Sequence, residues 1–124
     1  MLTKSVKIRS IINADEKSLA QKIADDLIRS LSVSAKITAE IACYEDECHY
    51  EVSFTFKLSA DSFDLLEHQS FLLCTKIAVG PWLFLTLPTK EDDFEFEAIF
   101  NHEAFIHKSQ EYINKLKWAH LEIN

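Results

Sequence analysis

Two hydrophobic periodicities follow one another at the start of the chain: an alternation along residues 3–12, then a repeat of three to four along residues 15–31. The alternating segment gathers its apolar residues on one side, at Val6, Ile8 and Ile12. This pattern predicts a half-buried strand. The second segment repeats large apolar residues every four positions, at Leu19, Ile23, Leu27 and Leu31, which predicts an amphipathic helix. Asn13 and Glu16 have the spacing of a capping pair, so we expect Asn13 to cap this helix.

Residues 33–43 and 48–58 also alternate, and together they predict a β-hairpin around the tip residues 44–47. The two apolar rows match when three pairs lie opposite one another: Cys43 with Cys48, Ile41 with Tyr50, and Ile37 with Phe54. A slip by one residue would turn one apolar row to solvent, so the register is strongly specified. The same register places Glu40 opposite Glu51, and like charges opposed across strands destabilise a sheet by roughly 0.2–1 kcal/mol.

The middle of the chain has a less regular pattern. Asp61 can cap a helix that carries apolar residues at Phe63, Leu66, Leu73 and Ile77. We expect this helix to extend to about residue 70, whereas residues 71–79 fit a helix or a strand. Residues 82–87 are apolar on both faces, which is typical of a central strand with a neighbour on each side.

The last third of the chain begins with another alternating segment, residues 94–100, which predicts a strand. Residues 103–121 carry an apolar stripe at Phe105, Ile106, Tyr112, Ile113, Leu116 and Ala119. This stripe predicts a final helix, with Asn101 as its cap.

The expected order of elements is β-α-β-β-(α)-β-β-α, in one domain over residues 1–124. Amphipathic helices bury their apolar stripes on a sheet, so we expect an α+β fold: an antiparallel sheet of about five strands packed on one face by two or three helices. The expected core joins hairpin residues to helix residues: Ile37, Ile41, Val52, Phe54, Leu19, Ile23, Leu27 and Leu116. The composition, with 48% hydrophobic residues but one Gly and two Pro, suits a packed core with few long loops.

The net charge of −7 is concentrated in the middle of the chain, where residues 37–107 hold three Lys or Arg against fourteen Asp or Glu. Such a field repels phosphate backbones and anionic membranes and attracts basic proteins, so we expect neither nucleic acid nor a membrane as a partner. The same charge would also keep a protein soluble. The first residues lack the apolar run of a signal peptide, and no stretch reaches about 18 apolar residues, so we expect a cytoplasmic protein.

Motifs for cofactor binding and catalysis are few. A single glycine excludes a phosphate-binding loop and a dinucleotide fingerprint, so we expect no cofactor. Cys43, Cys48 and His49 offer three ligands on two different strand faces, so we expect no metal. His102 and His107 do not share a helix face. We therefore expect no catalytic residues and no enzyme activity.

The three cysteines are expected to be reduced and structural, because an odd number of thiols in a cytoplasmic protein does not suggest a disulfide framework. Cys74 has no nucleophile signature around it. A bridge between Cys43 and Cys48 across the hairpin is the alternative.

Two acidic segments with interleaved aromatic residues are the candidate partner-binding sites. The first, at the predicted hairpin tip, contributes Glu45, Asp46, Glu47 and Glu51. The second, at another predicted tip, contributes Glu91, Asp92, Asp93, Glu95 and Glu97. We expect these carboxylates to steer a basic partner by long-range attraction. If no helix covers Trp82 and Phe84, they form an apolar patch beside the second segment and a further candidate interface.

No motif identifies a family. In size and acidity alone, the chain is similar to the immunity proteins that neutralise bacterial toxins, which are small, acidic and varied and often cover a basic nuclease active site. The resemblance implies an inhibitor that blocks a basic toxin domain, which is the leading hypothesis. The first alternative is a small acidic secretion chaperone that acts as a homodimer and wraps an effector segment. The second is a small ligand-binding or catalytic domain.

Overall fold

The computed structural model describes residues 1–31, 36–37, 41–44, 46–78, 82–89, 94–101 and 116–124. Its elements are β1 (Leu2–Asn13), α1 (Lys17–Ser30), β2 (Lys36–Ile37), β3 (Ala42–Tyr44), β4 (Asp46–Ala60), α2 (Phe63–Ile77), β5 (Trp82–Thr86), β6 (Phe96–Asn101) and β7 (Leu116–Ile123). They form an antiparallel sheet with two helices, which confirms the predicted α+β class. Neither of these helices is long and apolar enough to cross a membrane.

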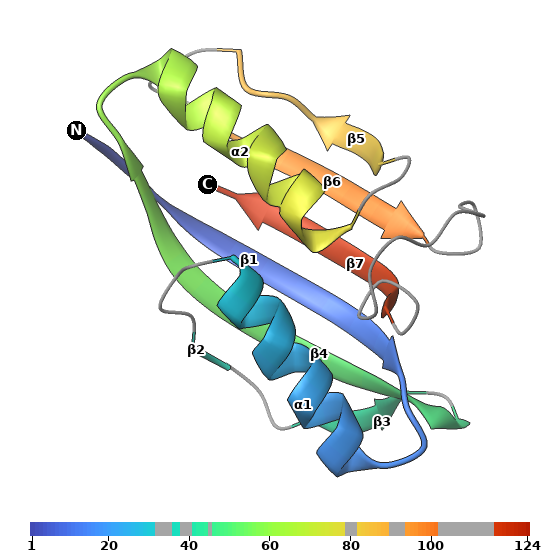
Figure 1. Ribbon diagram of the computed structural model, residues 1–124. Coiled ribbons are helices and arrows are strands. Elements are labelled where there is room, and N and C mark those ends of the chain that lie inside the picture. The colour runs from blue at the N-terminus through green and yellow to red at the C-terminus, as the bar shows by residue number, and fades with distance from the viewer. Residues whose placement is uncertain (32–35, 38–40, 45, 79–81, 90–93, 102–115) are drawn as a thin grey trace.

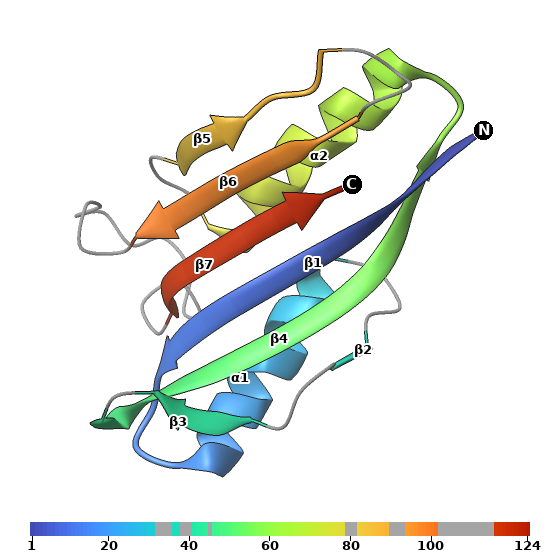
Figure 2. The same ribbon diagram turned by 180° about the vertical axis from the view of Figure 1, so that it is seen from behind.

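All of these strands belong to one sheet, in the order β2-β4-β1-β7-β6-β5, with β3 also paired to β4. Both helices lie against the same face of the sheet (Figure 1): α1 over the half that contains β1 and β4, α2 over the half that contains β6 and β7. Seen from behind, the other face presents only strands among the described elements (Figure 2). We call this second face the open face.

The core is built from every second residue of the strands. β1 buries Val6, Ile8 and Ile12, whereas Lys7 and Arg9 between them are exposed. Ser10 shares the buried side, and its hydroxyl donates a hydrogen bond of 3.0 Å to the carbonyl oxygen of Val52. This bond satisfies the only polar side chain that β1 buries, so it is buried without an unmet hydrogen bond.

Most of the predicted core residues are confirmed. Six of the predicted core residues are at most 8% exposed: Ile23, Leu27, Ile41, Val52, Phe54 and Leu116. Leu19 is partly buried and packs against them, while the side chain of Ile37 lies outside the described part of the structure. The first helix and the hairpin therefore share one core, as their periodicities predict.

The first helix has the predicted extent but not the predicted cap. α1 falls within the expected residues 15–31. Asn13 is instead the last residue of β1, opposite His49 on β4, so strand pairing holds it away from the helix. The N-cap position belongs to Glu16, whose side chain makes no capping hydrogen bond.

The second helix decides the ambiguity in the middle of the chain. α2 continues to Ile77, so the part of 71–79 that the structure describes up to this residue is helical. Its cap is Ser62 rather than Asp61: the Ser62 hydroxyl accepts a hydrogen bond of 3.2 Å from the backbone N–H of Leu65. The helix buries Leu66, Ser70, Leu73, Cys74 and Ile77 against the sheet.

The hairpin forms with a shifted tip. Ile37 lies opposite Phe54 as predicted. Nearer the tip, Cys43 lies opposite Tyr50, so two predicted pairs are wrong: Cys43 with Cys48, and Ile41 with Tyr50. At Ala42 and Cys43 the pairing has moved by two residues relative to the prediction, and a shift by two keeps the alternation of the two strand faces. An apolar alternation therefore cannot distinguish the two registers.

The shift also changes the surroundings of Glu51. Its neighbour on β3 is Ala42, so the predicted opposition of Glu40 and Glu51 is wrong. On the other side of β4, Glu51 lies opposite Ile11 of β1. The sheet thus avoids the like-charge pair that the predicted register would have created.

The predicted C-terminal helix is wrong where the structure describes it. Leu116–Ile123 is a strand, β7, which lies between β1 and β6; the earlier part of the predicted stripe, through Ile113, lies outside the described residues. Ala119, Leu121 and Ile123 are buried and alternate with half-buried residues, which is a strand period. The spacing of Leu116 and Ala119 also fits a helix. The edge of β1 away from β4 needs a hydrogen-bonding partner, and β7 satisfies it.

The strand predicted over residues 94–100 is confirmed as β6. The strand over residues 82–87 forms as β5, but its predicted central position is wrong. Within the described part of the chain β5 pairs with β6 alone and lies at the end of the sheet, while β1 and β7 occupy the centre. Its apolar side chains are correspondingly exposed, and Leu83 reaches 62%.

The face that β4 turns to the core can be tested by removing Phe54, which is fully buried. Phe54→Ala should lower the free energy of unfolding by roughly 3–5 kcal/mol, because it removes a large side chain and leaves a cavity. Thr55→Ala, on the neighbouring residue that points to the open face, should cost less than about 1 kcal/mol. Urea denaturation measures the free energy of unfolding of both variants. A Phe54→Ala variant with the stability of wild type would show that this face of β4 is not buried.

Candidate functional site

The open face carries the side chains that alternate with the core residues of each strand. Residues directly opposite one another on neighbouring strands define rows across it. Read from β4 through β1 and β7 to β6, three rows are Glu51–Ile11–Trp118–Asn101, Ser53–Arg9–His120–Ile99 and Thr55–Lys7–Glu122–Glu97. Charged and aromatic side chains from four strands therefore gather on one surface.

Three carboxylates meet where β6 and β7 form one corner of this face. Glu97 lies directly opposite Glu122. Glu95 joins them at a small hollow of about 150 Å³, which Thr86 and Asn124 also line. We call Glu95, Glu97 and Glu122 the acidic corner. Because like charges opposed across strands repel one another, this corner has a net attraction for a cationic group.

His120 makes a hydrogen bond within the acidic corner. Its Nε2 lies 2.6 Å from Oε2 of Glu97, and the two side chains are 23% and 31% exposed. A carboxylate oxygen only accepts, so the imidazole donates this hydrogen bond. The bond ties β7 to β6 on the open face and offsets part of the repulsion between Glu97 and Glu122.

The same residues have the chemistry of a metal site. One ligand atom from each of Glu97, His120 and Glu122 lies within 4.8 Å of the others. Imidazole nitrogen and carboxylate oxygen are ligands that zinc accepts, so the three could hold a divalent ion with solvent as a further ligand. The same oxygens can equally accept hydrogen bonds from a lysine or arginine of another protein.

A chain of contacts links the acidic corner to the opposite end of the face. Arg9 Nε lies 3.1 Å from Oε1 of Glu51, and the Arg9 guanidinium lies 5.0 Å from the ring centroid of Trp118. The Trp118 ring stacks on His120, with centroids 6.1 Å apart and planes 13° apart. Each side chain therefore restricts its neighbour, and the group presents a preorganised surface.

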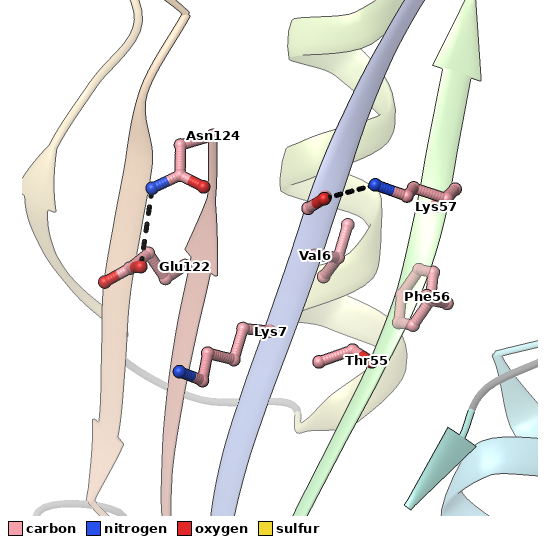
Figure 3. Close-up of a pocket in the computed structure, with 8 residues that line it drawn as sticks. Val6, Lys7, Thr55, Phe56, Lys57, Glu122 and Asn124 are labelled. Atoms are coloured by element: carbon pink, nitrogen blue, oxygen red, sulfur yellow. Dashed lines mark hydrogen bonds between the residues drawn. The ribbon is translucent and has the colours of Figure 1, made fainter. Parts of the chain in front are cut away.

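A basic zone lies beside this chain, over β4 and β1 (Figure 3). It is a hollow of about 760 Å³, lined by Ser5, Val6, Lys7, Thr55, Phe56, Lys57, Glu122 and Asn124. Lys57 Nζ donates a hydrogen bond of 2.6 Å to the hydroxyl of Ser5. Lys7 lies across the strands from Glu122, at the boundary with the acidic corner. The open face thus carries two lysines over β1 and β4 and three carboxylates at β6 and β7, and Glu122 lines both hollows.

Of the nine predicted site residues, the structure describes the side chains of Glu51, Glu95 and Glu97. The other six lie outside that part: Glu45, Asp46, Glu47, Glu91, Asp92 and Asp93. Glu51 and Glu97 both belong to the open face, but their rows are four residues apart along the strands. Their own strands, β4 and β6, are three strand spacings apart. They are therefore about 13 Å apart along the strands and about 14 Å apart across them. Glu51 is also paired with Arg9, so the acidic corner is the stronger candidate.

Sequence reasoning missed the residues that complete the face: Arg9, Trp118, His120 and Glu122. A signal was present in the last three, which recur at every second position and alternate with Ala119 and Leu121. The competing helical interpretation of this segment hid it. The alternation of β1 puts Arg9 on the side away from Val6 and Ile8, but its partners could not be found without the position of β7.

Cys74 has a structural environment. Its side chain is 2% exposed in the stripe that α2 buries, and burial raises the pKa of the thiol to about 12. A thiol nucleophile needs the opposite shift, because the thiolate is the reactive form.

No family model matches the chain, and no curated protein sequence matches it. The function therefore has to be inferred from the residues of the chain itself.

The burial of Cys74 predicts a pH dependence of stability. The folded protein holds the thiol proton more tightly than the unfolded chain, so the contribution of this proton is complete below pH 9 and is lost as the pH rises from 9 towards 12. Between pH 9 and 10.5 the loss should be about 2 kcal/mol. Urea denaturation of wild type and Cys74→Ala measures it as a narrowing difference between the two proteins. A constant difference over this range would show that Cys74 is accessible to water.

The coupling between His120 and Glu97 can be measured with a double-mutant cycle. His120→Ala should destabilise the fold by up to about 1 kcal/mol, because it removes the ring stack and leaves Glu97 and Glu122 opposed. In a Glu97→Gln background the same change should cost less. Equal costs in both backgrounds, from chemical denaturation at pH 6, would show that the contact contributes nothing to stability.

Proposed function

We propose that the protein binds a basic protein through the open face of its sheet and thereby inhibits it, as immunity proteins neutralise bacterial toxins. The partner in this proposal is a basic toxin domain of nuclease type, and the protein acts in the cytoplasm as a binding protein rather than an enzyme. The observation that carries the proposal is the separation of charge on the open face. The acidic corner lies over β6 and β7, and the two lysines of the basic zone lie over β1 and β4.

This separation supports recognition in one orientation. Glu97 on β6 and Lys57 on β4 are three strand spacings apart, or about 14 Å. A partner with a basic patch opposite the acidic corner and an acidic group opposite the lysines is attracted in that orientation and repelled in the reverse one. The pattern thus selects a partner more sharply than the overall acidity could.

The residues between the two charged zones suit the centre of an interface. Tryptophan and arginine are the side chains that most often carry binding energy in protein complexes. Trp118 and Arg9 are already held by each other and by His120 and Glu51, so little side-chain entropy is lost when a partner covers them. The open face therefore combines an apolar anchor with charged surroundings.

The acidic segment 91–93, which directly precedes Phe94 and Glu95 in the sequence and lies outside the described residues, adds to the negative charge of the chain. A net charge of −7 accelerates association with a basic protein, and salt screens this effect beyond a Debye length of about 8 Å at physiological strength. Rim carboxylates of this kind act mainly on the association rate.

A second candidate function is an acidic secretion chaperone that acts as a dimer and binds an effector segment. The observation that favours it is the exposed apolar edge strand β5, which offers a place for a second copy or for an extended segment. The two functions differ in what is bound: a folded basic domain in the first, an unfolded segment in the second.

The leading proposal predicts a salt-dependent association that depends on the acidic corner. The partner is first isolated from the native host with tagged wild-type protein and identified by mass spectrometry. Stopped-flow association with the purified partner should then slow by an order of magnitude or more when Glu95, Glu97 and Glu122 are all replaced by Lys. Wild-type association should also slow steeply between 50 and roughly 300 mM salt.

A matched control reverses three carboxylates on the helix side of the protein, Asp25, Asp26 and Glu67, with the same change in net charge. The proposal expects this control to bind much faster than the acidic-corner variant, and both must keep the wild-type circular dichroism spectrum. Equal association rates for the two variants would mean that only net charge matters. A captured partner that is an unfolded segment would favour the chaperone.

A further inference from the structure

We propose that β5 is the dimerisation edge of this protein: two copies pair their β5 strands antiparallel and form one continuous sheet. The first observation is the sequence of the strand, Trp82-Leu83-Phe84-Leu85-Thr86, which is apolar on both faces and contains no charge. Strands of this composition occupy central positions. β5 nevertheless pairs only with β6 among the described strands, so its other edge has no strand partner in that part of the chain.

The exposed side chains around β5 form an apolar patch. They are Leu83 at 62%, Phe84 at 39%, Leu85 at 48%, Leu87 at 49% and, on the adjacent helix α2, Phe71 at 37%. Phe71 and Phe84 belong to the same cluster, with ring centroids 5.3 Å apart. Together these residues expose on the order of 500 Å² of apolar surface, which is at the upper end of what a monomer leaves in water.

Among the described residues, the edge has one of the features that prevent strand pairing, the bulge at Leu85, and lacks the others. Natural edge strands are usually very short, charged or covered. The other end of this sheet follows that rule, because β2 and β3 have two and three residues. β5 has five residues, and its one irregularity is a bulge that inserts Leu85, another apolar residue.

A second copy of the chain is the occupant that this edge fits best. Two acidic chains with a net charge of −7 each repel one another least where their surfaces are neutral, and β5 offers such a surface. A basic partner, in contrast, would find no carboxylate on the strand to pair with. Antiparallel pairing of a strand with itself is a two-fold operation, so one patch serves both copies.

The strand is also complementary to itself in this arrangement. With the two-fold axis at Phe84, the phenylalanines of the two copies meet, and Leu83 of each copy lies opposite the bulge residue Leu85 of the other. Aromatic and aliphatic cross-strand pairs of this kind stabilise a sheet. Thr86, the one polar residue of the strand, lies outside the apolar centre.

The dimer has a consequence for binding, which rests on the proposed function. A two-fold axis perpendicular to the sheet keeps both open faces on the same side. The two copies of Glu97 are then separated by three strand spacings, or about 14 Å, across the new interface. The two acidic corners thus form one broad surface for a basic partner, and each dimer presents it once.

The test is the mass of the purified protein in solution without any partner, so its outcome is independent of the proposed function. Light scattering coupled to size exclusion at about 100 μM should give twice the chain mass of 14.3 kDa for wild type. Leu83→Lys should give the single-chain mass, because each copy would bring one lysine to the interface and its charge would lose contact with water. Leu83 is the most exposed residue of the strand, so the monomer should keep its circular dichroism spectrum.

Leu72→Lys is the matched control, since Leu72 is 41% exposed on α2 and outside the patch. This variant should remain a dimer. A wild-type protein that is monomeric at this concentration would overturn the proposal. A dimer that persists in Leu83→Lys would also overturn it, because the interface would then lie elsewhere.

Discussion

The pairing of β1 on both of its edges is the interaction on which the rest of the structure depends. β1 runs antiparallel to β4 on one side and to β7 on the other, and so joins the two ends of the chain in one sheet. Its two-residue alternation sends Val6 and Ile8 into the core and Lys7 and Arg9 to the open face. The neighbouring strands have the same two faces, core and open, because residues opposite one another point to the same side of the sheet.

The candidate site is a product of this division rather than of any motif. Arg9 of β1, Glu51 of β4, Trp118 and His120 of β7 and Glu97 of β6 are distant in sequence and become neighbours only when four strands align. Their mutual contacts fix an aromatic and charged surface at the boundary between a basic and an acidic zone. The one thiol whose side chain the structure describes, Cys74, lies apart from this surface, buried under α2, where burial raises its pKa.

The fold could be predicted where one periodicity was decisive, as in β1, α1, β4 and β6. The sequence misled where two patterns coincided, since the spacing of Leu116 and Ala119 fits a helix while β1 required a strand there. The hairpin tip shifted by two residues because such a shift keeps both apolar rows in place. β5 has the composition of a central strand but lies at the end of the sheet. Apolar composition indicates that a strand is stabilised by burial, but it does not indicate whether the same chain or another one buries it. Of the site, Glu51, Glu95 and Glu97 were predicted from the sequence, whereas the β7 residues Trp118, His120 and Glu122 were missed because that segment was interpreted as a helix.

The most direct measurement of the central claim is carboxylate labelling of the protein alone and in its purified complex. Coupling of a small amine to carboxyl groups, read by mass spectrometry, reports the accessibility of each residue. The account predicts that Glu95, Glu97 and Glu122 are labelled in the free protein and protected in the complex, while Asp25 and Glu67 on the helix side are labelled equally in both. Protection of the helix side with an unprotected acidic corner would contradict it.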